Sequence, residues 1–197
     1  MITQAKSSAF KLRVAKSILQ AGGIIAYPTD TIAGLGALPI YPQSIEKIIA
    51  FKQRKKNKGL ILLGSNIGQF SDWIDPNDKN KLKKMNAKQD RPTTFLVHPH
   101  PYLNQKSLKL ISGQFEKIAV RISKIEHIRE LIGELNCPII STSLNIAGKP
   151  TLTKNYQVKQ FFSELDYCVD LNWTYSTDAT HSQIIDLHSG KTIRYSD

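Results

Sequence analysis

Several segments of the chain place hydrophobic residues at helical spacing. In residues 10–19, Leu12, Ala15 and Leu19 share one face, which predicts a helix that Gly22 and Gly23 end. A second helix is expected at 42–52, where Pro42 suits the first turn. Further helices are predicted at residues 78–85, 126–135 and 153–165, the first of these as a polar surface helix.

Short apolar runs between these helices predict strands. They lie at residues 24–27, 60–63, 94–97, 118–122, 139–140, 183–187 and 192–195. The last two flank residues 188–191, whose sequence His-Ser-Gly-Lys is typical of a hairpin turn. Strands and helices therefore interleave, which predicts an α/β or α+β fold around a twisted sheet. We find no internal repeat or linker, so a single domain over residues 1–197 is expected.

Composition agrees with a globular protein. The 197 residues are 41% hydrophobic and 22% charged. No apolar run is long enough to cross a membrane, and the first residues lack the pattern of a signal peptide. The two cysteines, Cys137 and Cys168, are not arranged as CxxC, which argues against a disulfide framework or a structural zinc site. A cytoplasmic location is expected.

The chain is strongly basic, with a formal net charge of +11. Many of the cations fall in two clusters: Lys47, Lys52, Arg54, Lys55, Lys56 and Lys58; and Lys79, Lys81, Lys83, Lys84, Lys88 and Arg91. Clustered cations favour nucleotide or nucleic-acid partners. For the second cluster, a solvated surface is an equally good interpretation.

Polar residues gather at the ends of four predicted strands. Residues 27–36, Tyr-Pro-Thr-Asp-Thr-Ile-Ala-Gly-Leu-Gly, offer hydroxyls and a carboxylate but also suit a capped turn. The cations of residues 52–58 run directly into a buried strand, which favours phosphate binding. Arg121 stands between apolar residues and needs an anion, from either the protein or a ligand. Residues 141–150, Ser-Thr-Ser-Leu-Asn-Ile-Ala-Gly-Lys-Pro, combine hydroxyls, an amide and a flexible turn.

Common catalytic signatures are missing from the sequence. There is no Walker A motif, GxGxxG, GxSxG or HExxH. His98 and His100 could ligate a metal, but His-Pro-His in a proline-rich loop is more typical of a plain loop, and the remaining histidines are scattered. No nucleophile and base can be paired from spacing.

Taken together, the four polar segments resemble the YrdC/TsaC family of L-threonylcarbamoyladenylate synthases. The resemblance rests on Tyr-Pro-Thr-Asp-Thr at 27–31, Lys-Gln-Arg at 52–54 with Lys-Gly-Leu-Ile-Leu at 58–62, Ala-Val-Arg at 119–121, and residues 141–150. It runs from about residue 10 to 195 and is closest to the short bacterial form. It implies a mixed sheet with flanking helices around a large, basic cavity.

The resemblance also implies a reaction. These enzymes, which are nucleotidyltransferases, condense L-threonine, bicarbonate or carbon dioxide, and ATP into threonylcarbamoyl-AMP and pyrophosphate. The product supplies a tRNA threonylcarbamoyl transferase that forms N6-threonylcarbamoyladenosine (t6A37). Mg²⁺ is expected on the phosphates, with no protein nucleophile and no identified metal ligands. The alternatives are a non-catalytic RNA-binding protein that uses the same basic concavity, and a carbamoyl-transferring enzyme with another acceptor.

The family roles map onto individual positions. L-threonine contacts are expected from Thr31, Arg121, Ser141 and Ser182. ATP contacts are expected from Lys52, Arg54, Lys58, Lys117, Ser143, Thr151 and Arg194. Asn145 would support the loop that carries Ser143.

The sequence also departs from the family pattern. A Trp-Pro-Gly-Pro-x-Thr-like stretch is reduced to Pro92 and Thr94 within residues 89–94. Single departures occur at Lys55, Leu63, Leu144 and Ala147. These positions bear on substrate selectivity rather than on the cations expected at ATP.

Overall fold

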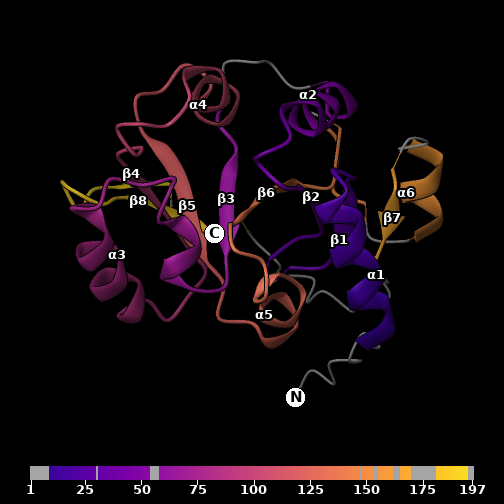
Figure 1. Cartoon of the computed structure of the whole chain (residues 1–197), viewed down its shortest axis with the longest axis horizontal. Helices are drawn as coiled ribbons and strands as arrows, with labels where there is room; N and C mark the ends of the chain where they lie inside the picture. Colours follow the sequence, from indigo (N-terminus) through magenta and orange to yellow (C-terminus); the bar gives the residue numbers. More distant parts are fainter. Residues whose placement is uncertain are drawn as a thin grey trace.

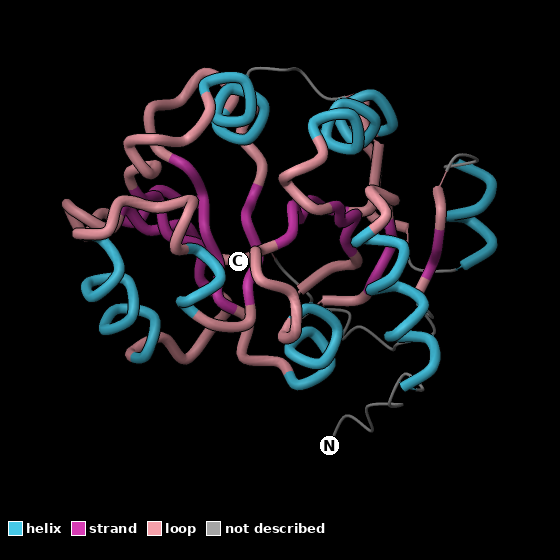
Figure 2. The backbone as a smooth tube through the Cα atoms, in the orientation of Figure 1, coloured by secondary structure: helices cyan, strands magenta, loops and turns pink. Residues whose placement is uncertain are grey.

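A nine-stranded sheet runs through the middle of the molecule, with helices on both sides (Figures 1 and 2). The computed structural model describes residues 9–29, 31–53, 58–146, 148–152, 155–161, 165–169 and 181–194. Its helices are α1 (Ala9–Gln20), α2 (Pro42–Phe51), the 3-10 helix η1 (Ile67–Phe70), α3 (Asp78–Ala87), α4 (Gln105–Ser112), α5 (Glu126–Ile132) and α6 (Asn155–Phe161). Its strands are β1 (Ile25–Tyr27), β2 (Gly34–Ala37), β3 (Ile61–Gly64), β4 (Thr93–Val97), β5 (Ile118–Ile122), β6 (Ile139–Ser143), β7 (Tyr167–Cys168), β8 (Gln183–Asp186) and β9 (Thr192–Arg194).

The sheet is mixed, as predicted. Its strand order is β7-β1-β2-β6-β3-β5-β4-β8-β9. Three neighbouring pairs are parallel, namely β1 with β7, β3 with β5, and β4 with β8. The remaining pairs are antiparallel, so β6 lies antiparallel to both β2 and β3 near the centre.

Two hydrophobic layers cover the sheet. On one face, α1 and α5 pack Leu12, Leu19 and Ile132 against Ile25 and Ile139 of the strands. On the other face, α2 and α4 contribute to a larger core that also holds residues of α3 and α6. Figure 1 shows α2 and α4 above the central strands and α1 and α5 below them. Among the described residues, no helix is both long and apolar enough to span a bilayer.

Most predicted elements are confirmed, but several bounds and identities differ. The predicted helix at 126–135 ends at Ile132, because Gly133 caps it and donates its backbone N–H to Arg129. The predicted strand at 139–140 runs on to Ser143, since both of its neighbours supply backbone partners. The helix at 78–85 is less superficial than expected, because Leu82 is fully buried.

Four elements were not predicted, namely β2, η1, α4 and β7. Gly34 and Gly36 belong to residues 27–36, whose sequence suits a capped turn, and glycines weaken strands. Strand β2 forms because β1 and β6 pair with it on both sides. Helix α4 does have a local signal, since Asn104 Oδ1 accepts from the backbone of Lys106 and Ser107 at 2.9 and 3.3 Å.

Candidate functional site

A cavity of about 320 Å³ opens beside the carboxyl end of β6. It collects residues from the β1–β2 connection, the start of β3, strands β5 and β6, and the β8–β9 hairpin. The residues that line it are Thr29, Thr31, Ile32, Gly34, Lys58, Gly59, Leu60, Ile61, Arg121, Ser141, Thr142, Ser143, His181, Ser182 and Arg194.

The alternation of side chains along β6 explains why its hydroxyls reach the cavity. Ile139 belongs to the core under α1 and α5, so Ser141 and Ser143 project from that same face. Ile140 and Leu144 belong to the opposite core under α2 and α4. The buried residues on the far face therefore hold the two serines toward the cavity.

A glycine pair in β2 makes room for a tyrosine that orients Ser141. Gly36 and Gly34 stand opposite Ser141 and Ser143 across the β2–β6 pairing. A Cβ added to Gly36 would lie 2.8 Å from Tyr27 Cε1, so the tyrosine ring occupies the space that a side chain would need. Tyr27 Oη donates to Ser141 Oγ at 2.7 Å. Burial raises the pKa of Tyr27, which keeps its hydroxyl protonated as a donor.

Two threonines and Arg121 form the buried end of the cavity. Thr29 Oγ1 accepts from the backbone N–H of Thr31 at 3.1 Å and donates to the Ile32 carbonyl at 2.8 Å, which fixes this turn. Arg121 Nη1 donates to Thr31 Oγ1 at 3.4 Å.

Arg121 itself carries an energetically unfavourable charge. Its side chain is only 6% exposed. Burial lowers the pKa of Arg121 to about 10; nearby Arg194 lowers it further, and Tyr27 opposes the shift. A cation whose charge is destabilised in this way gains from an incoming carboxylate or phosphate.

The β8–β9 hairpin contributes a third wall. Ser182, directly before β8, and Thr94 of β4 share a buried hydrogen bond of 2.8 Å between their hydroxyls. Arg194 donates to the Ser182 carbonyl through Nε and Nη2, at 3.2 and 2.7 Å. Beside them, burial lowers the pKa of His181, and the positive charges of Arg194 and Lys52 lower it further. His181 is therefore neutral at neutral pH and becomes easier to protonate when an anion enters.

Lys52 lies behind the cavity wall and is almost completely buried, with 1% exposed. Its ammonium donates to Asn145 Oδ1 at 2.7 Å, the Asn145 carbonyl at 2.8 Å, Ser143 Oγ at 3.3 Å, and the Ser143 carbonyl. Ser143 Oγ also donates to Asn145 Oδ1 at 2.6 Å. Lys52 thus ties the end of α2 to the loop after β6 and sets the position of Ser143.

The structure brings most of the predicted site residues together. All four candidates for L-threonine line the cavity, namely Thr31, Arg121, Ser141 and Ser182, as do the ATP candidates Lys58, Ser143 and Arg194. Among the described residues, the lining does not include Lys52, Lys117 or Thr151. Lys117 Nζ pairs instead with Asp186 Oδ2. Arg54 lies outside the described residues.

Some cavity residues were missed by sequence reasoning. His181 has no sequence signal of its own, because only the fold brings it together with Arg194 at the cavity. Thr29 was noted as a hydroxyl of the first polar segment but was given no role. Tyr27 was likewise assigned no contact, although it stands in the same segment.

The departures from the family pattern fall in different places. Leu144 is fully buried in the core under α2 and α4, behind the cavity wall rather than in it. Leu63 is buried in the core under α1 and α5, opposite Arg121 in the β3–β5 pairing. In the divergent 89–94 stretch, Gln89 Oε1 and Thr93 Oγ1 accept from Gln183 Nε2 at 2.9 and 2.7 Å, which joins it to β8. Lys55 and Ala147 lie outside the described residues.

Comparison with known proteins gives a consistent picture. A model of the Sua5, YciO and YrdC proteins, described as "Telomere recombination", matches residues 17–196. The threonylcarbamoyl-AMP synthase of Pseudomonas entomophila (strain L48) is 34% identical over 188 residues, which cover 95% of this chain and 98% of that protein.

Solved structures share the fold. P. abyssi Sua5 complexed with L-threonine matches with a TM-score of 0.79 and 24% identity, over 96% of this chain and 55% of Sua5. The chain therefore spans little more than half the length of that protein. E. coli YciO matches with a TM-score of 0.77 and 19% identity, over 96% of this chain and 90% of YciO. From the match across residues 17–196, the chain belongs to the Sua5/YciO/YrdC family.

Proposed function

We propose that this chain is a threonylcarbamoyl-AMP synthase, a transferase that condenses L-threonine, bicarbonate or carbon dioxide, and ATP. The observation that carries the proposal is 34% identity to the P. entomophila synthase over 98% of that enzyme. The cavity supports it independently, because it joins a buried arginine to a row of hydroxyls and further cations. The product would feed tRNA t6A37 formation through a separate transferase. We also propose a cytoplasmic location and a single domain over residues 1–197.

We assign the threonine carboxylate to Arg121 and Thr31. At this end of the cavity Thr31 and Arg121 are 7% and 6% exposed, and burial disfavours the charge of Arg121, so a carboxylate there would stabilise it. Ser141, oriented by Tyr27, and Ser182, held by Thr94, would then hydrogen bond to the rest of the amino acid. The complex of Sua5 with L-threonine is consistent with such a ligand in this fold.

We assign ATP to the side of the cavity bounded by Lys58, Ser143 and Arg194. Their charges and hydroxyl suit phosphate oxygens. Lys52 would act through Ser143 and Asn145, because its ammonium is already surrounded by their oxygens. Arg54, Lys117 and Thr151 remain proposed ATP contacts from the family pattern alone.

The chemistry needs positioning more than a reactive side chain. The threonine amine adds to carbon dioxide and loses a proton, giving a carbamate. A carbamate oxygen attacks the α-phosphorus of ATP, the bond to the β-phosphate oxygen breaks, and pyrophosphate leaves. Cations that hold both anions in line supply orientation and electrostatic stabilisation.

Mg²⁺ fits this arrangement as a partner of the phosphates. Among the described residues, the cavity lining contains hydroxyls and cations but no carboxylate, so an all-protein magnesium cage is not formed there. Mg²⁺ commonly keeps several waters and binds substrate phosphates. When bound, it would neutralise charge on the leaving pyrophosphate.

The proposal is tested by incubating the purified protein with ATP, bicarbonate and labelled L-threonine. We expect pyrophosphate to form only when all three are present, together with a labelled adenylate. Ser182→Ala should raise the threonine concentration needed, whereas Ser17→Ala, on the exposed surface of α1, should not. Pyrophosphate released without threonine would contradict the assigned substrate, and no ATP turnover under any condition would contradict a synthase.

The RNA-binding alternative rests on the second cation cluster. Within it, Lys79 donates to Ser71 Oγ at 2.9 Å and Lys81 to the His188 carbonyl at 3.3 Å, so part of this charge is used inside the fold. Lys83→Ala/Lys84→Ala distinguishes the two functions. A synthase should keep its activity in this variant, whereas an RNA-binding protein should lose its function.

A further inference from the structure

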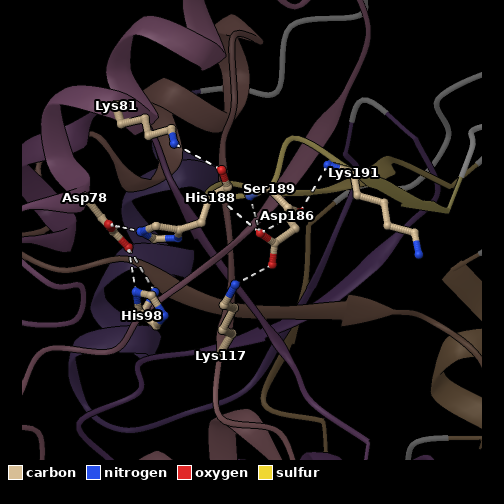
Figure 3. Close-up of polar contacts among 8 residues, drawn as sticks. All are labelled: Asp78, Lys81, His98, Lys117, Asp186, His188, Ser189 and Lys191. Atoms are coloured by element: carbon tan, nitrogen blue, oxygen red, sulfur yellow. Dashed lines mark hydrogen bonds and ion pairs between the residues drawn. The ribbon is translucent and has the colours of Figure 1, made fainter.

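Two histidines and a buried aspartate meet outside the cavity, at the opposite end of the β8–β9 hairpin. They are Asp78 at the start of α3, His98 directly after β4, and His188 in the hairpin turn. Figure 3 shows both imidazoles directed at the Asp78 carboxylate. These residues come from three separate segments, and the proposed reaction does not use them.

Their donor atoms converge. His188 Nε2 lies 2.9 Å from Asp78 Oδ1, and His98 Nδ1 lies 3.7 Å from Asp78 Oδ2. The two imidazole centroids are 4.3 Å apart, with the rings tilted by 46°. One donor atom from each residue can be chosen so that all three lie within 4.8 Å of one another.

The backbone holds each histidine in place. The His98 N–H donates to Asp78 Oδ2 at 3.0 Å, and its carbonyl accepts from Asp75 at 3.0 Å. The His188 N–H donates to Asp186 Oδ1 at 3.0 Å, and its carbonyl accepts from Lys81 Nζ at 3.3 Å. Both rings are thus attached to backbone that is fixed without a ligand, which is how preorganised sites are built.

Burial and charge are also suitable for a cation. The Asp78 side chain is 5% exposed, whereas those of His98 and His188 are 48% and 38% exposed, so the cluster has a buried carboxylate and an open side. Nearby, the charge of Asp186 is balanced by Lys117. Lys81 also lies near the cluster, and its ammonium is directed at the backbone carbonyl of His188.

We propose that Asp78, His98 and His188 bind a divalent transition-metal cation of the zinc class. Two neutral imidazoles and one carboxylate are ligands that Zn²⁺ favours and that Mg²⁺ does not. With metal–ligand bonds near 2.0–2.1 Å, tetrahedral ligands stand about 3.3 Å apart, so the donor atoms, now within 4.8 Å of one another, would have to draw closer around the metal. Water would take the fourth position on the open side.

Such a metal would join the hairpin turn to α3 and to the end of β4. The same hairpin carries Arg194, whose guanidinium holds the Ser182 carbonyl at the cavity. The metal would therefore restrain the strand pair that forms one cavity wall, without contacting the reactants.

The site is tested by adding Zn²⁺ or Co²⁺, each on its own, to protein that a chelator has stripped of metal. Isothermal titration with Zn²⁺ should give one site per chain that is lost or at least about tenfold weaker in both His98→Ala and His188→Ala. Co²⁺ should give visible d–d absorption in wild type that both variants lose. His100→Ala is the matched control, since it removes a histidine two residues from His98 that is outside the cluster, and its binding should equal wild type.

His98→Gln shows whether weaker zinc binding comes from a lost ligand or from misfolding. This variant should fold normally, because His98 is nearly half exposed and glutamine keeps a polar side chain there. Unchanged circular dichroism together with weakened zinc binding in this variant supports the site. The proposal is overturned if wild type binds no Zn²⁺ at about 100 μM, well above typical protein zinc-site affinities. It is also overturned if folded His98→Gln and His188→Ala bind zinc as tightly as wild type. Neither outcome depends on synthase activity.

Discussion

Replacing Arg121 with methionine should make the ligand-free protein more stable while removing its response to threonine. Burial lowers the pKa of Arg121 from the ordinary 12.5 to about 10. At about 1.4 kcal/mol for each pKa unit, the folded protein is destabilised by about 3 kcal/mol for keeping this side chain charged. The destabilisation is fully present at neutral pH and disappears only as the pH rises through the folded and then the unfolded pKa.

The substitution removes the charge and leaves an apolar side chain of similar length. The guanidinium loses its hydrogen bond to Thr31 and a further interaction, at about 1 kcal/mol each, so we expect a net gain of about 1 kcal/mol in the free energy of unfolding at neutral pH. Urea denaturation followed by circular dichroism measures this change, with an unchanged slope against urea as the check on two-state behaviour.

A control variant and a second measurement separate the effect on threonine binding from the effect on stability. Arg129→Met, at an exposed position of α5, should change the free energy of unfolding by no more than about 0.5 kcal/mol. L-threonine should raise the melting temperature of wild type and of Arg129→Met but not of Arg121→Met. If Arg121→Met is less stable than wild type by more than about 1 kcal/mol, the contacts of Arg121 stabilise the fold by more than its buried charge destabilises it, and the reasoning is wrong.

Three further results are expected. Gly36→Ala should lower the free energy of unfolding by about 1–3 kcal/mol, because its Cβ would lie 2.8 Å from the buried Tyr27 ring. Gly34→Ala is the control: the nearest atom to its Cβ would be 3.4 Å away, so the loss measured in the same urea titration should be clearly smaller. Equal losses in the two variants would refute the argument. The hydrogen bond from Lys117 holds the pKa of Asp186 well below its usual range, so its contribution to stability is present above about pH 4 and lost as the pH falls toward the folded pKa. Asp186→Asn should accordingly flatten the acid part of a stability-against-pH curve, and a curve parallel to wild type would contradict this role. Finally, ATP should raise the pKa of His181, which burial and the charges of Arg194 and Lys52 hold low in the free protein. An NMR titration of the His181 imidazole with and without ATP measures this change. An unchanged pKa at saturating ATP would show that His181 does not lie at the nucleotide site.

Local sequence patterns were sufficient for most elements and for much of the cavity. Apolar runs marked β3 and β5, and the isolated Arg121 within β5 pointed to a buried cation before any contact was known. The pattern failed where tertiary pairing overrides local preference, as in β2, whose glycines read as a turn but pair on both sides. It also failed where residues distant in the chain act together, because no spacing links His98 to His188 or His181 to Arg194.

The roles of individual cations were harder to predict than their presence. Lys52 and Lys58 belong to one basic cluster in the sequence, but Lys58 lines the cavity and Lys52 is buried behind it. The difference depends on where α2 ends and on the oxygens of Ser143 and Asn145, which only the folded loop brings to the ammonium. Lys117 was assigned to ATP from the family pattern, and its carboxylate partner Asp186 lies far away in sequence.

The pairing of β6 makes correct strand register a condition of chemistry as well as of folding. Along β6 and the residue after it, Ser141 and Ser143 face the cavity, whereas Ile140 and Leu144 on the other face belong to the core under α2 and α4. A slip of one residue would turn the serines into the core and expose the apolar side chains in the cavity. A chain with that error would lose its substrate hydroxyls and much of its core together. Misregistered molecules would therefore be unstable as well as inactive, so they would unfold and would not persist as folded, inactive protein.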